Sequence, residues 1–223
     1  MAEVEEFDSR EAMTAAARAA VLDALRAGLD ERGRASLAAS GGSTPVPLYE
    51  ALAGETALPW ERVTVTLADE RVVPPDHEHR NGKMVRRTLL SGPARAAAYL
   101  PLDEEGTLDA DLFPLDVAVM GMGEDGHTAS WFPASPGLAD ALEGAPEAVV
   151  RTVPDPMPKD APHERLTLTR AGVTGARLAL LLVSGERKRA VLDEAMRHGQ
   201  VETMPVRALL HAPGANLRVM YAD

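Results

Sequence analysis

Four short apolar segments, each ending directly in a polar or glycine-rich turn, constrain the fold of this chain more than any other feature. The segments are 35–39, 63–67, 117–120 and 178–183, and their turns read SGGSTP, DER, GMGEDGH and SGERK. Such runs are typical of strands buried on both faces, and helical patterns lie between them. The alternation predicts an α/β fold, a Rossmann-like and mostly parallel sheet with helices on both faces, in one domain over residues 1–223.

The remaining pattern predicts the other elements. A first helix is expected from a cap at Asp8 or Ser9 to Gly28 or Gly33, because apolar residues between them recur at helical spacing. The segment 145–160 contains four prolines and is expected to be mostly loop. Further helices are expected over 46–52, 81–90, the stretch before Arg197 and 205–210, and further strands over 148–153, 165–169 and 217–221.

The four turns should meet. In a parallel sheet they all emerge from the carboxyl edge of the strands, and open α/β sheets bind ligands in the crevice at that edge. Residues far apart in the sequence therefore converge there for topological reasons. We expect one site rather than four.

Composition limits the classes of molecule that this chain is expected to bind and the chemistry it can use. The net charge is −11 and the isoelectric point about 5.0, which argues against nucleic acid or an anionic membrane as a partner. An anionic substrate would have to be held by a few local cations and backbone amides. The chain has no cysteine, so thiolate catalysis, disulfides and cysteine-bound metals are excluded. The acidic first residues do not resemble a signal peptide, and no apolar stretch is long enough to span a bilayer, so we expect a cytoplasmic protein.

The first turn, SGGSTP, offers backbone amides and hydroxyl groups at the start of a helix, an arrangement that favours an anion such as phosphate. Its alternative interpretation is a tight turn with a serine or threonine cap. The nucleotide P-loop and GxGxxG patterns are both absent. The candidate binding residues here are Gly41, Gly42, Ser43 and Thr44.

Two other turns are ambiguous when taken alone. Asp69-Glu70-Arg71 places both signs of charge at a strand end, and by itself it indicates a surface ion pair. Lys188 lies in the first turn of a helix, where a cation opposes the helix dipole. A bound anion would account for that position, although a solvated helix start is the simpler explanation.

The third turn carries the proton-transfer candidate. Histidine is the side chain type best suited to moving a proton near neutral pH, and Asp125 is close enough in sequence to His127 to orient its ring. The alternative is a histidine that caps the next helix, with Asp125 accepting from backbone amides. His77 and His79 lie in a loop but lack a convincing third metal ligand. The GxSxG signature of a serine nucleophile is absent.

With these residues identified, the chain resembles the 6-phosphogluconolactonases, within the wider family that includes the glucosamine-6-phosphate isomerases and deaminases. Five motifs in the same order carry the resemblance. They are SGGSTP at 40–45, DER at 69–71, GMGEDGHTASWFP at 121–133, RLTLT at 165–169 and GxxKxxxL at 185–192.

The resemblance implies hydrolysis of 6-phospho-D-glucono-1,5-lactone in the oxidative pentose phosphate pathway, with no metal or organic cofactor. It also implies that His127 is the general base that activates water, with Asp125 fixing its tautomer. Asp69 matches an acid that handles the sugar proton in the isomerase branch. The phosphate and sugar would be held by the turn 41–44 together with Arg71, Arg165 and Lys188.

Several points stay open. Many lactonases have a Ser-Asn pair after the DER turn, but Arg80 precedes Asn81 here, so the contact of that serine is in doubt. An amino-sugar-phosphate isomerase or deaminase is the nearest alternative, yet that branch places an acid soon after its histidine, and 128–133 contains none. A sugar-phosphate-binding module without catalysis is the other alternative. We expect a monomer, with a homodimer as the second possibility.

Overall fold

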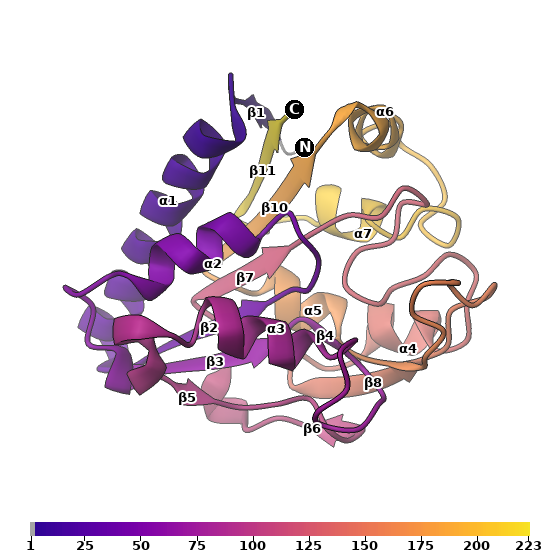
Figure 1. Ribbon diagram of the computed structural model, residues 1–223. Helices are drawn as coiled ribbons and strands as arrows, with labels where there is room; N and C mark the ends of the chain where they lie inside the picture. The colour runs from indigo at the N-terminus through magenta and orange to yellow at the C-terminus, as the bar shows by residue number, and fades with distance from the viewer. Residues whose placement is uncertain (1–2) are drawn as a thin grey trace.

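A seven-stranded sheet forms the centre of the computed structural model, which describes residues 3–223 (Figure 1). All of its strand pairs are parallel, which confirms the predicted Rossmann-like α/β sheet. In spatial order the strands are β1 (Val4–Glu6), β11 (Leu217–Ala222), β10 (Leu178–Ser184), β7 (Val117–Met120), β2 (Ala35–Ala39), β3 (Val63–Leu67) and β5 (Ala98–Tyr99).

The central strands are buried along their whole length. Every residue of β2 and β7 is buried, as is all of β10 except its last residue. A strand covered on both faces needs apolar side chains at successive positions, which explains the continuous runs in the sequence. The buried apolar side chains form one cluster around the sheet.

Helix α1 shows how local signals fix the helix ends. Ser9 is its N-cap and accepts a hydrogen bond from the Ala12 amide at 3.1 Å, while Gly33 ends the helix in the left-handed conformation with φ of 71°. The helix packs across strands β2, β7, β10 and β11. The α-helices are α1 (Arg10–Arg32), α2 (Val46–Ala53), α3 (Asn81–Thr88), α4 (Leu138–Glu143), α5 (Arg170–Thr174), α6 (Glu186–Ala195) and α7 (Arg207–Leu210).

The order of the strands puts helices on both faces. From β1 to β5 the chain moves along the sheet in one direction, and from β7 to β11 it moves back. Because parallel crossovers are right-handed, the helices of the first half cover one face and those of the second half cover the other. Figure 1 shows α1 and α2 lying over the first face. Three short 3-10 helices complete the connections: η1 (Trp60–Arg62), η2 (Gly92–Ala96) and η3 (Ala110–Leu112).

A second, four-stranded antiparallel sheet was not expected from the sequence. It consists of β4 (Asp69–Arg71), β9 (Arg165–Leu168), β8 (Ala148–Thr152) and β6 (Gly106–Thr107), in that order. The DER turn is thus itself a strand, which leaves the main sheet after Ala68 and pairs Arg71 with Arg165. The predicted strands 148–153 and 165–169 exist, but they belong to this sheet and lie antiparallel.

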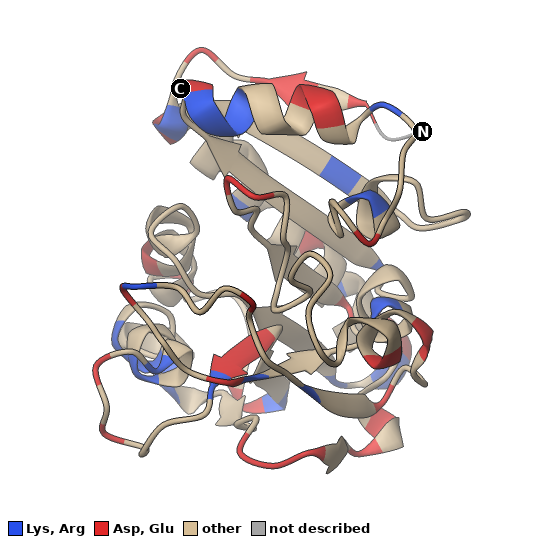
Figure 2. Cartoon of the chain, turned by 90° about the vertical axis from the view of Figure 1, so that its right-hand side faces the viewer, with Lys and Arg blue, Asp and Glu red and all other residues tan. Residues whose placement is uncertain are grey.

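Charge is distributed over the whole molecule. The sequence contains 34 acidic residues against 23 lysines and arginines, and Figure 2 shows both signs interspersed along the ribbon. Within residues 3–223, no helix is long and apolar enough to cross a membrane. Because the net field is negative, any anion site must depend on local donors.

Candidate active site

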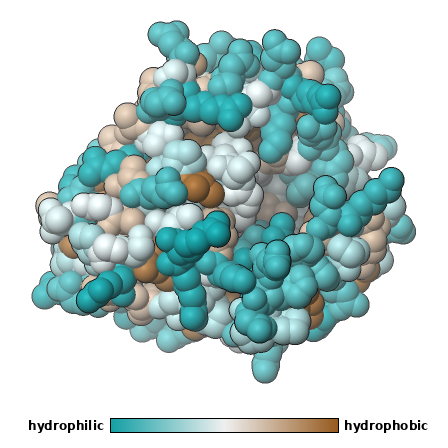
Figure 3. All heavy atoms as spheres, viewed as in Figure 1, coloured by the Kyte–Doolittle hydropathy of each residue, from teal (hydrophilic) through white to brown (hydrophobic). Residues whose placement is uncertain are grey.

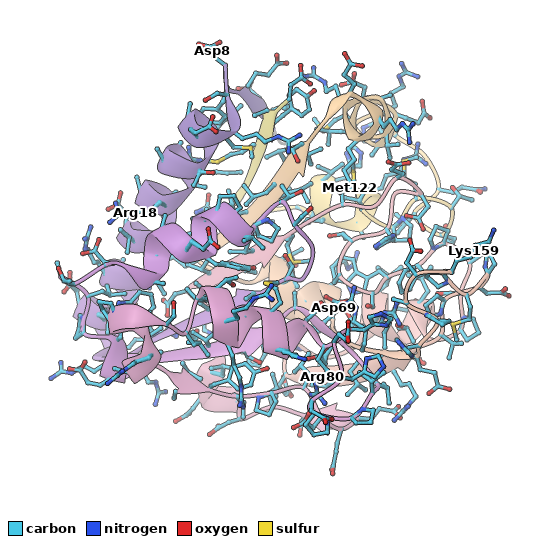
Figure 4. All side chains as sticks on the ribbon, in the orientation of Figure 1. Asp8, Arg18, Asp69, Arg80, Met122 and Lys159 are labelled. Atoms are coloured by element: carbon cyan, nitrogen blue, oxygen red, sulfur yellow. The ribbon has the colours of Figure 1, made fainter. Side chains whose placement is uncertain are left out.

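The turns that follow β2, β7 and β10 meet β4 around one pocket of about 210 Å³. Figure 3 shows the hollow in the middle of the face that carries α2 and α3. Figure 4 labels Asp69 from β4 and Met122 from the turn after β7, on either side of this region. The structure therefore brings the four turns together as topology requires. The lining residues are Ser40, Gly41, Gly42, Ser43, Thr44, Pro45, Asp69, Arg71, Asn81, Gly121, Met122, Gly123, His127, Ala129 and Lys188.

The turn after β2 presents open hydrogen-bond donors. Within residues 3–223, none of the backbone amides from Gly41 to Thr44 donates a hydrogen bond. Gly42 has φ of 88°, and a Cβ there would meet no atom within 4 Å, so it faces open space. Thr44 Oγ1 lies 3.2 Å from Ser184 Oγ at the end of β10. A row of unpaired amides at the start of α2 is a suitable cradle for an anion.

The turn after β7 fixes a histidine–carboxylate pair. The Asp125 carboxylate lies 2.5 Å from His127 Nδ1 and also accepts from the His127 amide at 3.1 Å. Gly123 is essential to this packing, because a Cβ there would lie 2.2 Å from His127 Nδ1. Asp125 thus does both things that the sequence suggested for it: it orients the His127 ring and it accepts from a backbone amide. The bond leaves Nε2 as the ring nitrogen available to the pocket.

Burial and hydrogen bonding shift the pKa of the Asp125 carboxyl in opposite directions. Partial burial alone would raise the pKa of its carboxyl, but the hydrogen bond and charge of His127, together with backbone amides, lower the pKa below its usual value. Asp125 therefore stays ionised at a lower pH than an ordinary aspartate does. A carboxylate fixed at Nδ1 is suited to stabilise a positive charge that appears on the imidazole.

Asp69 is a buried carboxylate with an ordered set of partners. It is 8% exposed, and it accepts from Ser130 Oγ at 2.5 Å and from Asn81 Nδ2 at 3.2 Å. Neighbouring Glu70 is 1% exposed and accepts from backbone amides at the start of α3. The interpretation of DER as a surface ion pair is wrong. The motif instead carries two buried acids that tie β4 to α3.

Three cations surround the pocket in different ways. Lys188 lines it and is half-buried, and burial lowers the pKa of its ammonium group while the charge of Glu124 opposes that shift. Lys188 is thus not a fully solvated helix start. Arg71 also lines the pocket, and its Nη1 donates to the His79 carbonyl at 2.5 Å.

Arg165 is not a lining residue. It is 3% exposed, and its guanidinium donates to the carbonyls of His163 and Ala161. Burial, followed by the charge of Arg71, lowers the pKa of Arg165 to about 10. Its guanidinium carbon lies 5.8 Å from the centre of the Phe132 ring, which in turn lies 4.7 Å from the His127 ring. Arg165 therefore supports the pocket from behind, and two neighbouring guanidiniums there would be stabilised by an anion.

A larger hollow of about 880 Å³ lies elsewhere, between β1, β11 and the segment after α7. Among the described residues, its lining includes Glu3 and Glu5 but neither lysine nor arginine. A cavity with two acids and no cation is unsuited to an anion. The smaller pocket at the carboxyl edge is therefore the candidate active site.

Sequence reasoning did not single out Asn81 or Ser130 as site residues, although both lay in quoted segments. Asn81 lines the pocket, and its side chain occupies the space that a Cβ on Gly41 would fill. Arg80 turns away, since its Nε donates to Glu70 at 3.2 Å and its Nη2 pairs with Asp103. Arg80 thus joins Glu70 to Asp103 and does not line the pocket.

The fold and the pocket together define a class of protein. It is an α/β protein that places an anion-accepting turn beside a histidine–carboxylate pair at the carboxyl edge of a parallel sheet. Residues 8–218 match the family described as glucosamine-6-phosphate isomerases/6-phosphogluconolactonase, and the chain belongs to this family.

Known proteins of this family are similar along most of the chain. A protein from Neisseria meningitidis serogroup A is 40% identical over 218 residues, covering 92% of each chain, and one from Pseudomonas aeruginosa is 45% identical over 207 residues, covering 87% of this chain and 85% of its own. Both are named 6-phosphogluconolactonase. The crystal structure of a 6-phosphogluconolactonase from Shewanella baltica superposes with a TM-score of 0.90 at 34% identity, covering 100% of this chain and 98% of its own. The chain is thus an enzyme of this family.

Proposed function

We propose that this enzyme hydrolyses 6-phospho-D-glucono-1,5-lactone to 6-phospho-D-gluconate, a step of the oxidative pentose phosphate pathway. The observation that carries the proposal is the His127–Asp125 pair, which faces a pocket whose other walls offer free amides and two cations. The names of the relatives support the same substrate.

The proposed reaction needs one proton-transfer group. A δ-lactone is already an activated ester, so water can attack C1 directly while His127 Nε2 accepts its proton. Asp125 holds Nδ1 and stabilises the imidazolium that forms. When the bond between C1 and the ring oxygen breaks, His127 returns the proton to that oxygen. Backbone amides of the glycine turns, at Gly41–Gly42 or at Gly121–Gly123, stabilise the oxyanion in between.

The phosphate does not change in the reaction, so its ligands act mainly on binding. We assign this role to the amides of 41–44, to Lys188 and to Arg71, with Arg165 acting from behind the pocket. Asp69 lies on the wall formed by β4, where it fixes Asn81 beside the sugar. The proposal includes catalysis without a metal or organic cofactor, by a monomer in the cytoplasm.

Lactone decay in a coupled assay tests the function. Glucose-6-phosphate dehydrogenase generates the lactone in place, and its loss is followed with the protein, without it, and with His127→Ala. We expect decay well above spontaneous hydrolysis that disappears in the variant. Decay at the spontaneous rate, with ammonia released from glucosamine 6-phosphate, would establish the deaminase alternative instead. Neither activity, with binding of 6-phosphogluconate retained, would indicate a binding module.

A further inference from the structure

Three histidines come together beside the pocket. His77 and His79 lie in the loop after β4, and His163 lies two residues before β9. One ring nitrogen from each lies within 4.8 Å of the others, and the ring centroids are 4.8 to 5.2 Å apart. The third ligand that the sequence did not reveal is therefore His163, which follows the proline-containing segment 145–160 and lies next to a loop distant in sequence.

Two of the rings are already within hydrogen-bond distance. His79 Nδ1 lies 2.8 Å from His163 Nε2, so one of these nitrogens carries a proton that the other accepts. A metal ion would replace that proton and accept both lone pairs. Tetrahedral zinc with bonds of about 2.0–2.1 Å separates two nitrogen ligands by roughly 3.3–3.4 Å, which requires a small outward movement of the two loops.

All three side chains are half-buried. Neutral imidazole is the form that ligates metal. His77 Nδ1 accepts from the His79 amide at 3.1 Å, and this bond would give way, because a ligating imidazole carries its proton on the other nitrogen.

We propose that His77, His79 and His163 form a binding site for a divalent transition-metal ion of the zinc class. Three protein ligands leave a fourth position open, as in zinc sites that retain a bound water. The guanidiniums of Arg71 and Arg165 oppose another cation nearby, so the fourth ligand is an anion or a hydroxide. The site is separate from the catalytic pocket, because none of the three histidines lines that pocket.

The same histidines carry the carbonyls that position the arginines. Arg71 Nη1 donates to the carbonyl of His79, and Arg165 Nη1 donates to the carbonyl of His163. A metal that joins the two loops would therefore stiffen both guanidiniums. This second part rests on the proposed function, and it predicts that metal tightens binding of the phosphorylated product without taking part in the reaction.

Metal uptake tests the site independently of any activity. Tag-free protein is stripped with a chelator and titrated with Zn²⁺ in equilibrium dialysis and with Co²⁺ in visible absorption. We expect one saturable ion per chain, intense Co²⁺ bands of tetrahedral type, and loss of both in His163→Ala and His79→Gln. His198→Ala is the matched control, because His198 stacks on His211 elsewhere in the chain. No saturable uptake, or uptake unchanged in His163→Ala with its circular dichroism intact, would overturn the proposal.

The link to the arginines needs a second measurement. Binding of 6-phosphogluconate is measured by calorimetry for the stripped and the Zn²⁺-loaded protein. We expect several-fold tighter binding with zinc in the wild type and no such gain in His163→Ala. Equal affinity with and without bound zinc would refute the link, while failure of the product to bind either form would count against the proposed function and leave the uptake result unaffected.

Discussion

The two glycine turns that line the pocket, after the neighbouring strands β2 and β7, use the same residue for opposite purposes. In the turn after β2, Gly42 adopts a left-handed conformation with open space around its missing side chain, and the amides point outward unpaired. In the turn after β7, Gly123 leaves room for the His127 ring pressed against its backbone. The turn after β2 therefore leaves its amides free for a ligand, whereas the turn after β7 packs tightly against its own side chains.

From this comparison we infer that the turn after β2 serves ligand binding and the turn after β7 serves proton transfer. An open turn adapts to the anion that it receives, so changes there should alter affinity first. A closed turn holds one side chain in one orientation, so changes there should alter the rate first. If this division is correct, the two turns respond differently to the same kind of substitution.

The largest effect is expected from His127→Ala. Loss of one acid–base group typically reduces the rate by roughly 10²–10⁴-fold. We expect kcat to fall in that range while the affinity for 6-phosphogluconate is retained, as measured by lactone decay and calorimetry. A kcat near that of the wild type would show that His127 is not the proton-transfer group, and it would contradict the division of roles between the two turns.

A matched pair of glycine variants tests the comparison directly. In Gly123→Ala the new Cβ would lie 2.2 Å from His127 Nδ1, so the ring must move. A displacement of about 1 Å can cost about 10²-fold in rate, so we expect kcat to fall by about that factor.

Gly42→Ala is the control for that variant. Its Cβ enters open space, but the left-handed backbone would cost about 1–2 kcal/mol of stability. We expect KM to rise, because the strained turn presents its amides to the phosphate less well. If the oxyanion is held at Gly121–Gly123, kcat stays near the wild-type value. Urea unfolding measures the loss of stability. Equal changes of kcat in the two variants would contradict the division of roles.

Lys188 sharpens the binding side of the comparison. Lys188→Ala should raise KM by roughly 10- to 150-fold at nearly unchanged kcat, because a charge-assisted hydrogen bond contributes about 1.5–3 kcal/mol. Since burial lowers the pKa of this lysine, product affinity should fall at a lower pH than an exposed lysine would require. Calorimetry between about pH 7 and pH 10 measures this, and Lys188→Arg should flatten the profile. An unchanged KM would place Lys188 outside the site.

Asp125→Asn should have the smallest effect on stability. The folded protein lowers the pKa of this carboxyl, so its contribution is present above the ordinary value of 3.8 and is lost as the pH falls through the folded value. Because Asp125 is half exposed, solvent screening limits the contribution to less than about 1 kcal/mol. Urea unfolding should show a difference from wild type at pH 7 that shrinks below about pH 4. A constant difference at both pH values would contradict this origin.

The sequence predicted the parallel sheet because its strands are buried on both faces and interrupted by helices. It also predicted that the turns converge, since that depends only on strand direction. The second sheet escaped prediction because β4 is three residues long and follows β3 after a single residue. Its pairing with β9 spans a long stretch of chain, and no local pattern specifies such a register.

Within the site, the motifs identified candidate residues but not the side chains that these residues contact. The pattern placed Asp125 near His127, and the structure shows the bond between them. Asp69 is buried against Ser130, and Arg165 lies against Phe132 instead of lining the pocket. Both positions depend on how the two sheets pack. Such contacts between distant segments leave no periodic signal in the sequence.

The position of β1 has a consequence for how the protein is made. In the sheet, β1 has a single neighbour, β11, and Val4 pairs with Val219. Among the described strands, β1 comes first in chain order and β11 comes last, so during synthesis β1 must wait for all the others before it can dock. This edge of the sheet therefore closes only after the turns that line the pocket have been made, so a stalled chain could contain every candidate site residue and still lack its outermost strand pair.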